Sequence, residues 1–257
     1  MKAAFRMMIL CLFFSCSQQE KNSVSPQAVS INDVTEDKAA TKNTAKEVEK
    51  PATPVCNYDN DVSDLGLGLV QAPTTFELFN DSLLTNLFLQ WDMHSSDTPP
   101  KPLCSKYYMP EYGIMHFICL QKTSTYFKVL VNFNEVKYFP ATTEYQFQTW
   151  ENYILSSYGI RRTTSEDGSI AYHQSLRSSP SESAKSIEIP EGLENFCPRE
   201  IKGDWVKVTY DCFYNVEEPM NEGEPCHNYI NKCKNPTSGW LRWRQKNKIL
   251  IDIFLMP

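Results

Sequence analysis

Short runs rich in Val, Ile, Tyr, Phe and Trp recur from residue 115 to the end of the chain, and turn residues separate many of them. In residues 126–132 (YFKVLVN) the pattern alternates, which puts Phe127, Val129 and Val131 on one side of a strand. Such runs predict a body that is mostly β. The strands expected from this pattern cover residues 115–120, 126–132, 135–140, 205–214, 239–243 and 249–256.

One segment has the period of a helix instead. Its large apolar residues recur at +3, +7 and +11, and Gly159 follows at the place of a helix C-cap. We therefore expect an amphipathic helix over residues 144–158. The residues that carry the period are Phe147, Trp150, Ile154 and Tyr158.

Residues 76–91 (FELFNDSLLTNLFLQW) allow two interpretations. Thr74 and Glu77 have the spacing of a capping box, which favours a helix. The alternative is a strand over FELF that ends in a turn at Asn80 and Asp81.

The first sixteen residues have a different pattern. Lys2 and Arg6 precede a short apolar run over residues 7–14, and Ser15 stands before Cys16. Eight apolar residues are too few to cross about 30 Å of hydrocarbon as a helix, so the run is typical of a signal peptide. The stretch resembles a bacterial lipoprotein signal, which implies removal of residues 1–15 and acylation of Cys16. An ordinary secretory signal that is cleaved nearby is the alternative.

Residues 16–55 predict a disordered tether behind that lipid. From residue 17 to 55 there is no aromatic residue and no glycine, so little apolar area can offset the ordering entropy. A flexible chain of this length reaches roughly 35 Å. The SQQE stretch after Cys16 resembles signals of Bacteroidetes-type surface lipoproteins. We expect lipid anchoring in the cell envelope, at the outer membrane, with the periplasmic or surface side left open.

The folded body is expected over residues 56–257, where aromatic residues are dense. The chain has 25 Lys and Arg against 31 Asp and Glu, and no basic stripe, which argues against a nucleic-acid partner. Seven cysteines in the body of an exported protein predict disulfides and leave one thiol free or paired to another molecule. These are Cys56, Cys104, Cys119, Cys197, Cys212, Cys226 and Cys233.

A local bridge between Cys226 and Cys233 fits their short spacing, CHNYINKC. Other pairings, such as Cys197 with Cys212 or Cys104 with Cys119, are also open. The CxxC spacing of structural zinc sites is absent, so we expect no metal.

Residues 204–211 (DWVKVTYD) and 239–244 (GWLRWR) resemble the bacterial SH3-like domain. In that pattern an aromatic residue and a Lys-Val pair end one strand, and a later Gly-aromatic pair starts another. The resemblance covers about residues 172–255 and is interrupted by a cysteine-containing insertion at 215–238. Its carriers are Asp204, Trp205, Val206, Lys207, Val208, Gly239, Trp240, Leu241 and Trp243.

The same pattern occurs earlier in the chain. Residues 76–90 parallel 175–189, and residues 122–132 parallel 201–211. The resemblance therefore implies two small SH3-like barrels joined by the helix, and it favours the strand interpretation of FELF. The expected domains are 56–142, a helix and connector over 143–171, and 172–257. The whole sequence resembles the uncharacterised SH3-domain lipoproteins of Bacteroidetes, and this resemblance implies an architecture and a location but no known activity.

No catalytic or cofactor motif is present. The chain lacks GxSxG, HExxH, P-loop and EF-hand patterns. His116 and Cys119 lie at odd spacing on one strand, which places them on opposite faces. We expect a non-enzymatic protein without a cofactor. The histidines weighed as catalytic candidates are His94, His116, His173 and His227.

Binding is the remaining class of function. SH3-like modules bind extended peptides in aromatic-lined grooves, and the candidates here are Tyr210, Tyr214, Trp240 and Trp243. Alternation in a barrel strand makes Trp205 or Trp240 a core residue. Arg242 and Arg244, near Lys246 and Lys248, are expected to form a solvated basic face, and Arg161 with Arg162 to complement the C-terminal dipole of the helix.

Two hypotheses follow. The first is a cell-envelope module that binds a peptide, cell-wall or protein ligand. The second is an inhibitor or immunity-type protein that blocks a secreted hydrolase through the insertion at 215–238, because a disulfide lowers the ordering cost of a loop.

Overall fold

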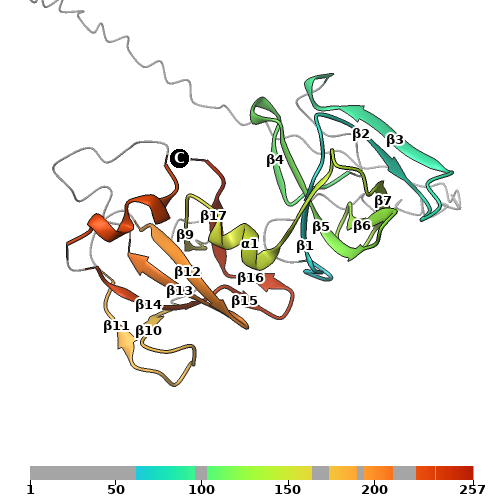
Figure 1. Cartoon of the computed structure of the whole chain (residues 1–257). Helices are drawn as coiled ribbons and strands as arrows, with labels where there is room; N and C mark the ends of the chain where they lie inside the picture. Colours follow the sequence, from blue (N-terminus) through green and yellow to red (C-terminus); the bar gives the residue numbers. More distant parts are fainter. Residues whose placement is uncertain are drawn as a thin grey trace, which may run out of the picture. The chain divides into compact units, whose positions relative to one another are not determined.

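A computed structural model describes residues 62–95, 103–163, 174–189, 194–210, 224–234 and 236–256. In this part the protein is mainly β, as the sequence predicts, and all strand pairs are antiparallel (Figure 1). Several predictions fall outside the described residues. These concern the signal peptide, Cys16, the 16–55 tether, Cys56, His173, Cys212 and Tyr214.

The first sheet has eight strands in the order β3-β2-β7-β6-β5-β1-β8, with β4 paired to β5. Two short 3₁₀ turns, η1 (Met93–Ser95) and η2 (Pro110–Tyr112), accompany it. Its strands are β1 (Gly68–Gln71), β2 (Thr75–Phe79), β3 (Leu87–Asp92), β4 (Tyr107–Met109), β5 (Ile114–Lys122), β6 (Tyr126–Leu130), β7 (Val136–Pro140) and β8 (Gln146–Thr149).

The second sheet has seven strands in the order β11-β10-β14-β13-β12-β9-β17. A small hairpin of β15 (Arg244–Gln245) and β16 (Lys248–Ile249) and the 3₁₀ turns η4 (Cys226–Asn228) and η5 (Ile230–Lys232) lie outside this path. Its strands are β9 (Gly159–Arg162), β10 (Leu176–Arg177), β11 (Ser186–Ile187), β12 (Phe196–Lys202), β13 (Trp205–Tyr210), β14 (Ser238–Arg242) and β17 (Ile251–Phe254).

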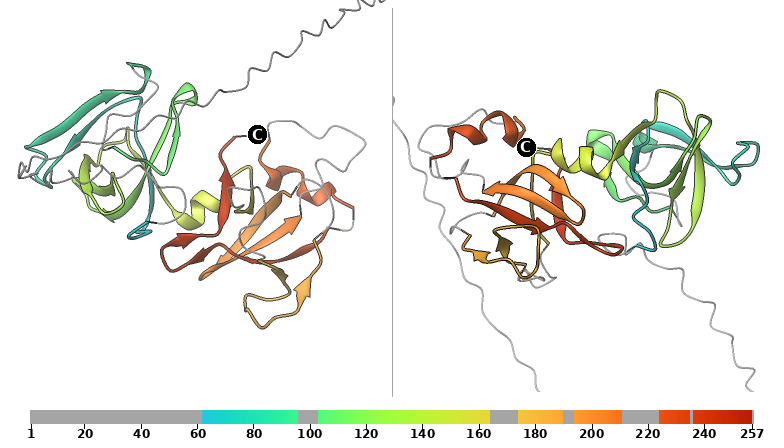
Figure 2. Two further views of the ribbon diagram at one scale, coloured as in Figure 1. Left: turned by 180° about the vertical axis from the view of Figure 1, so that it is seen from behind. Right: turned by 60° about the horizontal axis from the view of Figure 1, so that its bottom comes forward.

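The two sheets have the same topology. Read in order, β3 corresponds to β11, β2 to β10, β7 to β14, β6 to β13, β5 to β12, β1 to β9 and β8 to β17. The colours of Figure 2 show that each sheet is built from its own continuous stretch of chain. Each also has a β-bulge at the matching place, between Cys119 and Gln121 in β5 and between Pro198 and Glu200 in β12. An internal repeat predicts such a match.

Neither sheet closes into a barrel, which differs from the predicted barrel architecture. The strands at the two ends of each path, β3 and β8 in the first sheet and β11 and β17 in the second, have one neighbour each. The path from end to end is therefore an open antiparallel sheet in both halves.

The ambiguous segment 76–91 forms a hairpin, so the strand interpretation is confirmed and the helical one is wrong. Strand β2 pairs with β3 through Phe76 opposite Trp91. The Asp81 carboxylate organises the turn, because it accepts hydrogen bonds from the backbone N–H of Leu83 at 2.9 Å and of Asn86 at 2.7 Å. The turn chemistry thus prevails over the capping-box spacing.

The helix α1 spans Trp150–Leu155 and is shorter than the predicted 144–158. Its first part is replaced by β8, which pairs with β1. The Thr149 hydroxyl caps the helix by accepting a hydrogen bond from the backbone N–H of Asn152 at 3.2 Å. Beyond the helix, Gly159 begins β9.

Arg161 and Arg162 lie in β9, so they do not complement a helix dipole as predicted. The Nε of Arg161 lies 2.9 Å from the carboxylate of Asp252 in β17. The Nε of Arg162 lies 2.7 Å from the carboxylate of Glu194. Both arginines are thus used to hold neighbouring segments of the second sheet.

Trp150, the first residue of α1, joins the cores of the two sheets. Its side chain is 4% exposed, and its indole N–H donates to the Leu65 carbonyl at 2.7 Å. The ring centroids of Trp150 and Trp243 are 6.0 Å apart. Buried residues of both sheets, such as Leu69 and Val206, belong to the same hydrophobic cluster.

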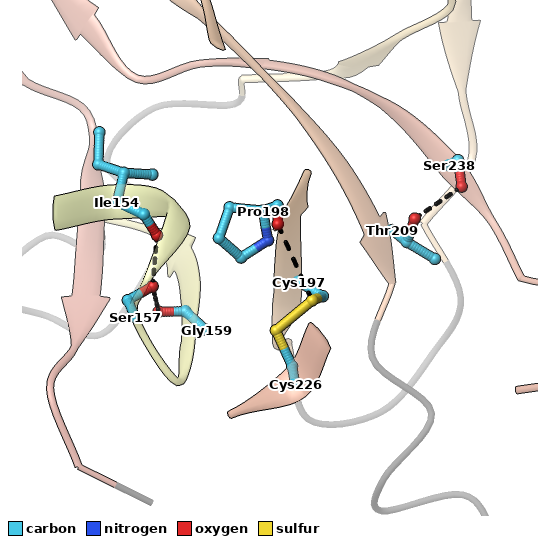
Figure 3. The surroundings of a disulfide bond; sticks show 8 residues. All are labelled: Ile154, Ser157, Gly159, Cys197, Pro198, Thr209, Cys226 and Ser238. Carbon is cyan, nitrogen blue, oxygen red and sulfur yellow. Dashed lines mark hydrogen bonds between the residues drawn. A yellow bond between two sulfur atoms is a disulfide. The ribbon is translucent and has the colours of Figure 1, made fainter. Parts of the chain in front are cut away.

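A disulfide joins Cys197 of β12 to Cys226 at the start of η4 (Figure 3). The predicted bridge between Cys226 and Cys233 is therefore wrong, and so is the pairing of Cys197 with Cys212. The reason is spatial, because η4 contacts β12 and brings Cys226 to the buried Cys197. Cys233 is also disulfide-bonded.

Cys104 is disulfide-bonded too, whereas Cys119 is a free, buried thiol. The predicted pairing of these two residues is wrong. Cys119 lies in the middle of β5, where it packs into the core of the first sheet.

Candidate functional site

The candidate aromatic residues that the structure describes, Tyr210, Trp240 and Trp243, do not come together on one surface. Tyr210 and Trp243 are buried, at 5% and 3% exposure, and only Trp240 of the described candidates is partly exposed. Tyr210 packs edge-on against Phe196, with ring centroids 5.8 Å apart. The Trp243 indole N–H donates to the Gly203 carbonyl at 2.9 Å. Tyr210 and Trp243 are therefore core residues rather than a groove.

The expectation that Trp205 or Trp240 is a core residue is wrong, because both side chains are partly exposed. In β13 the buried positions are Val206, Val208 and Tyr210, so Trp205 falls on the other face. This face of the second sheet has a hollow of about 340 Å³. The residues that line it are Gln174, Ser175, Arg177, Glu182, Trp205, Arg242, Gln245 and Leu250. We call this hollow the Trp205 pocket.

Arg242 is the central charged group of the Trp205 pocket. Its guanidinium forms an ion pair with Glu182, which lies in the loop between β10 and β11. A second nitrogen of the same guanidinium, Nη2, is 3.9 Å from the carboxylate of Asp204. Its Nε donates to the Arg244 carbonyl at 3.2 Å. Arg242 thus lies among carboxylates and is not the solvated basic residue that the sequence predicted.

Asp204 and Arg244 support the position of Arg242. The Nε of Arg244 is 2.7 Å from the Asp204 carboxylate, and its guanidinium carbon lies 4.8 Å from the centroid of the Trp243 ring. Because Asp204 is closer to Arg244 than to Arg242, it neutralises mainly Arg244. Arg242 is left with Glu182 as its main counter-charge.

Gln174 holds one wall of the Trp205 pocket. This nearly buried side chain accepts a hydrogen bond from the backbone N–H of Arg242 and donates one to the Leu250 carbonyl at 3.4 Å. The backbone carbonyl of Gln174 accepts a further hydrogen bond from Nη1 of Arg162 at 2.8 Å. No pattern in the sequence singles out Gln174, because its partners Arg242 and Leu250 are far away along the chain.

The first sheet has no such group of charges at the matching positions. The register pairs Tyr126 with Pro140 where the second sheet pairs Trp205 with Arg242. It likewise places Phe79 opposite Tyr138, where Arg177 stands opposite Trp240. The two arginines of the Trp205 pocket are thus specific to the second sheet.

A second hollow, of about 370 Å³, is associated with the first sheet. It is lined by Met93, His94, Tyr108, Pro110 and Glu111. Its lining has one carboxylate and one imidazole, and the described residues around it show no ion pair.

His116 is buried at 7% exposure beside two tyrosines. Its Nδ1 is 2.7 Å from the hydroxyl of Tyr153, and its Nε2 has no partner among the described residues. Burial lowers the pKa of His116 to about 4, so the ring is neutral at pH 7. Burial, and then the charge of Asp252, raise the pKa of the nearby Tyr107.

Cys119 lies in the same strand, and burial raises the pKa of its thiol to about 12. The thiolate is the nucleophilic form, so this thiol is unreactive at neutral pH. Among the described residues no three His, Cys, Asp or Glu side chains are grouped closely enough to hold a metal ion.

No protein-family model, no curated protein and no solved structure matches this chain. In the part of the chain that the structure describes, no helix has both the length and the apolar composition needed to cross a bilayer.

Proposed function

We propose that this protein is a lipid-anchored, non-catalytic binding module of the cell envelope, and that the Trp205 pocket is its ligand site. The observation that carries the proposal is the combination of a partly exposed tryptophan with Arg177 and Arg242 in one hollow. The ring offers apolar contact at low entropic cost, and arginines bind polar groups by several hydrogen bonds at once. The matching positions of the first sheet have Phe79, Tyr126 and Pro140 instead.

The proposal includes an SH3-like identity for both sheets. Two features support it, namely the DWVKVTYD and GWLRWR segments and the topology that the two sheets share. Strand β13 with its Lys-Val pair and strand β14 with its Gly-Trp pair lie side by side, with Lys207 opposite Trp240. The proposed ligand is a peptide or a cell-wall fragment.

A co-sedimentation experiment with isolated cell-wall sacculi tests the ligand site. The mature full-length chain, purified in detergent under oxidising conditions, is expected to sediment with sacculi. Replacing Trp205 with alanine should weaken binding about tenfold, since a central aromatic anchor is worth on the order of 1.4 kcal/mol or more. The fraction bound at several sacculus concentrations measures the change.

Tyr126→Ala is the matched control, because Tyr126 occupies the same register position in the first sheet. It should leave binding unchanged. Equal losses in both variants would contradict a site confined to the second sheet. A wild-type chain that stays in the supernatant would exclude the cell wall and direct the search to a protein ligand.

Lipid anchoring is proposed from the sequence of residues 1–16 and has its own test. When the chain is produced in a bacterial host, labelled palmitate should be incorporated, and the protein should fractionate with membranes. Cys16→Ser should abolish the label and release the chain from the membrane, because no acyl chain then holds it. Cys11→Ser, in the same signal region, is the control and should behave as wild type. Labelling that persists in Cys16→Ser would contradict acylation of this residue.

The inhibitor alternative depends on a protruding insertion at 215–238. In the described part of that insertion, Tyr229 and Ile230 pack with Cys197 and Cys226 in a small buried cluster. This packing does not favour a protruding loop, so the binding module is the better supported of the two functions.

A further inference from the structure

We infer that the ligand of the Trp205 pocket is an acidic peptide, and that its carboxylate binds Arg242 in the place that Glu182 holds in this structure. The inference rests on the proposed function, because it names the ligand class of the same pocket. It makes Glu182 an internal competitor of the ligand.

The ion pair between Arg242 and Glu182 is unequal. The Arg242 side chain is 25% exposed, whereas that of Glu182 is 73% exposed. A guanidinium that has lost most of its water needs an anionic partner, whereas an exposed carboxylate can return to water at little cost. Arg242 therefore depends on an acceptor at this position more than Glu182 depends on Arg242.

The loop that carries Glu182 is held in place by other contacts. The backbone N–H of Ser178 donates to the Lys185 carbonyl at 2.9 Å, and Nη1 of Arg177 donates to the Ala184 carbonyl at 3.0 Å. Glu182 can therefore leave Arg242 by rotation of its own side chain, while the loop and the pocket keep their shape.

Arg177 supplies the second cation of the pocket. Its Nη1 donates to the Ala184 carbonyl, whereas its Nε and Nη2 make no hydrogen bond with the described residues. The Arg177 side chain lines the same hollow as Arg242 and Trp205. A carboxylate on Arg242 would thus have a second guanidinium nearby and an aromatic ring for the carbon chain of its own residue.

The local charge favours a carboxylate over a phosphate. A carboxylate carries one negative charge, as the Glu182 side chain does, so the exchange leaves the charge that is paired with Arg242 unchanged. A phosphate would bring about two charges, close to Asp204, whose carboxylate is 3.9 Å from Arg242 Nη2. The repulsion from Asp204 would then oppose binding.

Two short peptides test the inference on the full mature chain in detergent. The probe is N-acetyl-Gly-Glu-Gly-amide, and its neutral counterpart has Gln in place of Glu. The NMR signal of the Trp205 indole N–H reports binding during titration. Only the Glu peptide is expected to shift this signal, and Arg242→Gln should abolish the shift.

Glu182→Gln provides the decisive comparison, because it removes the negative charge of the competitor and changes no other residue that lines the pocket. It should tighten binding of the Glu peptide by about two- to fivefold, the range by which an exposed ion pair shifts an equilibrium. Glu188→Gln is the matched control, since Glu188 is exposed, follows β11 and does not line the pocket. It makes the same change of net charge and should leave the affinity unchanged.

An affinity that is unchanged or weaker in Glu182→Gln would overturn the inference, as would equal binding of the Glu and Gln peptides. The result is separable from the sacculus test. Loss of sacculus binding in Trp205→Ala together with no effect of Glu182→Gln would keep the proposed function and remove the carboxylate exchange. Unchanged sacculus binding in Trp205→Ala together with tighter binding of the Glu peptide in Glu182→Gln would keep the carboxylate site and exclude the cell wall as the source of the ligand.

Discussion

Replacing Trp150 with alanine is expected to lower the free energy of unfolding by about 3–5 kcal/mol, the usual cost of deleting a buried tryptophan. The side chain is 4% exposed, and its ring packs against Tyr153 and Trp243, with centroid distances of 6.2 and 6.0 Å. The change would also leave the Leu65 carbonyl without the donor that it has at 2.7 Å. Urea denaturation followed by circular dichroism measures the loss.

Trp150→Phe is the matched variant, because it keeps an aromatic ring in the core and removes the indole N–H. Its expected cost is about 1–3 kcal/mol, mainly from the unpaired Leu65 carbonyl. A Trp150→Ala variant within about 1 kcal/mol of wild type would show that α1 does not join the two cores in solution.

The second large effect is expected at the disulfide between Cys197 and Cys226. These residues are 29 positions apart, and closing a loop of that size in the unfolded chain stabilises a protein by about 3–4 kcal/mol in the chain-entropy model. The double variant Cys197→Ala/Cys226→Ala should lose that amount. The double change avoids leaving a single reactive thiol. Urea denaturation under non-reducing conditions is the measurement.

Cys119→Ala is the control for loss of a buried sulfur without loss of a cross-link, because Cys119 is free and fully buried. Its expected cost is about 1 kcal/mol. If the double variant is no less stable than Cys119→Ala, the bond contributes nothing to stability. Hydrogen exchange at the backbone amides of Tyr229 and Ile230 should show the loss of stability locally in the η4–η5 segment, since both residues pack beside the bond.

Strands were predictable wherever alternation and turn chemistry agree. Residues 126–132 alternate, and the structure has β6 there. Of the strand expected over 205–214, the described residues 205–210 form β13. The predicted helix was too long because Phe147, which lies in β8, falls three residues before Trp150 and so matches the helical period. The hydrogen bonds of β8 with β1 decide its structure, and the period of one segment contains no information on a partner so far away in sequence.

The long-range pairings were not predictable for the same reason. Strand β9 pairs with β17, with Ile160 opposite Ile253, and the disulfide partner of Cys226 lies in β12. Spacing along the chain favoured the nearer Cys233. The repeat, by contrast, was predictable from the sequence, because segments 122–132 and 201–211 are similar.

The Trp205 pocket lies in the second sheet, as the described candidates chosen from the sequence do, but none of those candidates lines it. Selection by residue type favoured Tyr210 and Trp243, which are buried. The alternation of side chains along β13 was a better guide, because burial of Val206 and Val208 puts Trp205 on the outer face and Tyr210 on the inner face. The role of Glu182 had no sequence signal, since its contact with Arg242 spans two separate segments.

The place of the first strand in each sheet has a mechanical consequence. Strand β1 lies between β5 and β8, and β9 lies between β12 and β17, so each is hydrogen-bonded on both sides. If the protein is tethered through its N-terminus, as we propose, tension from that anchor would enter the first sheet at β1, after the buried residues Val62 and Leu65. Pulling β1 out requires rupture of two ladders, each pairing four of its residues. An edge strand would peel away one bond at a time, whereas this arrangement would resist a load applied through the N-terminal segment.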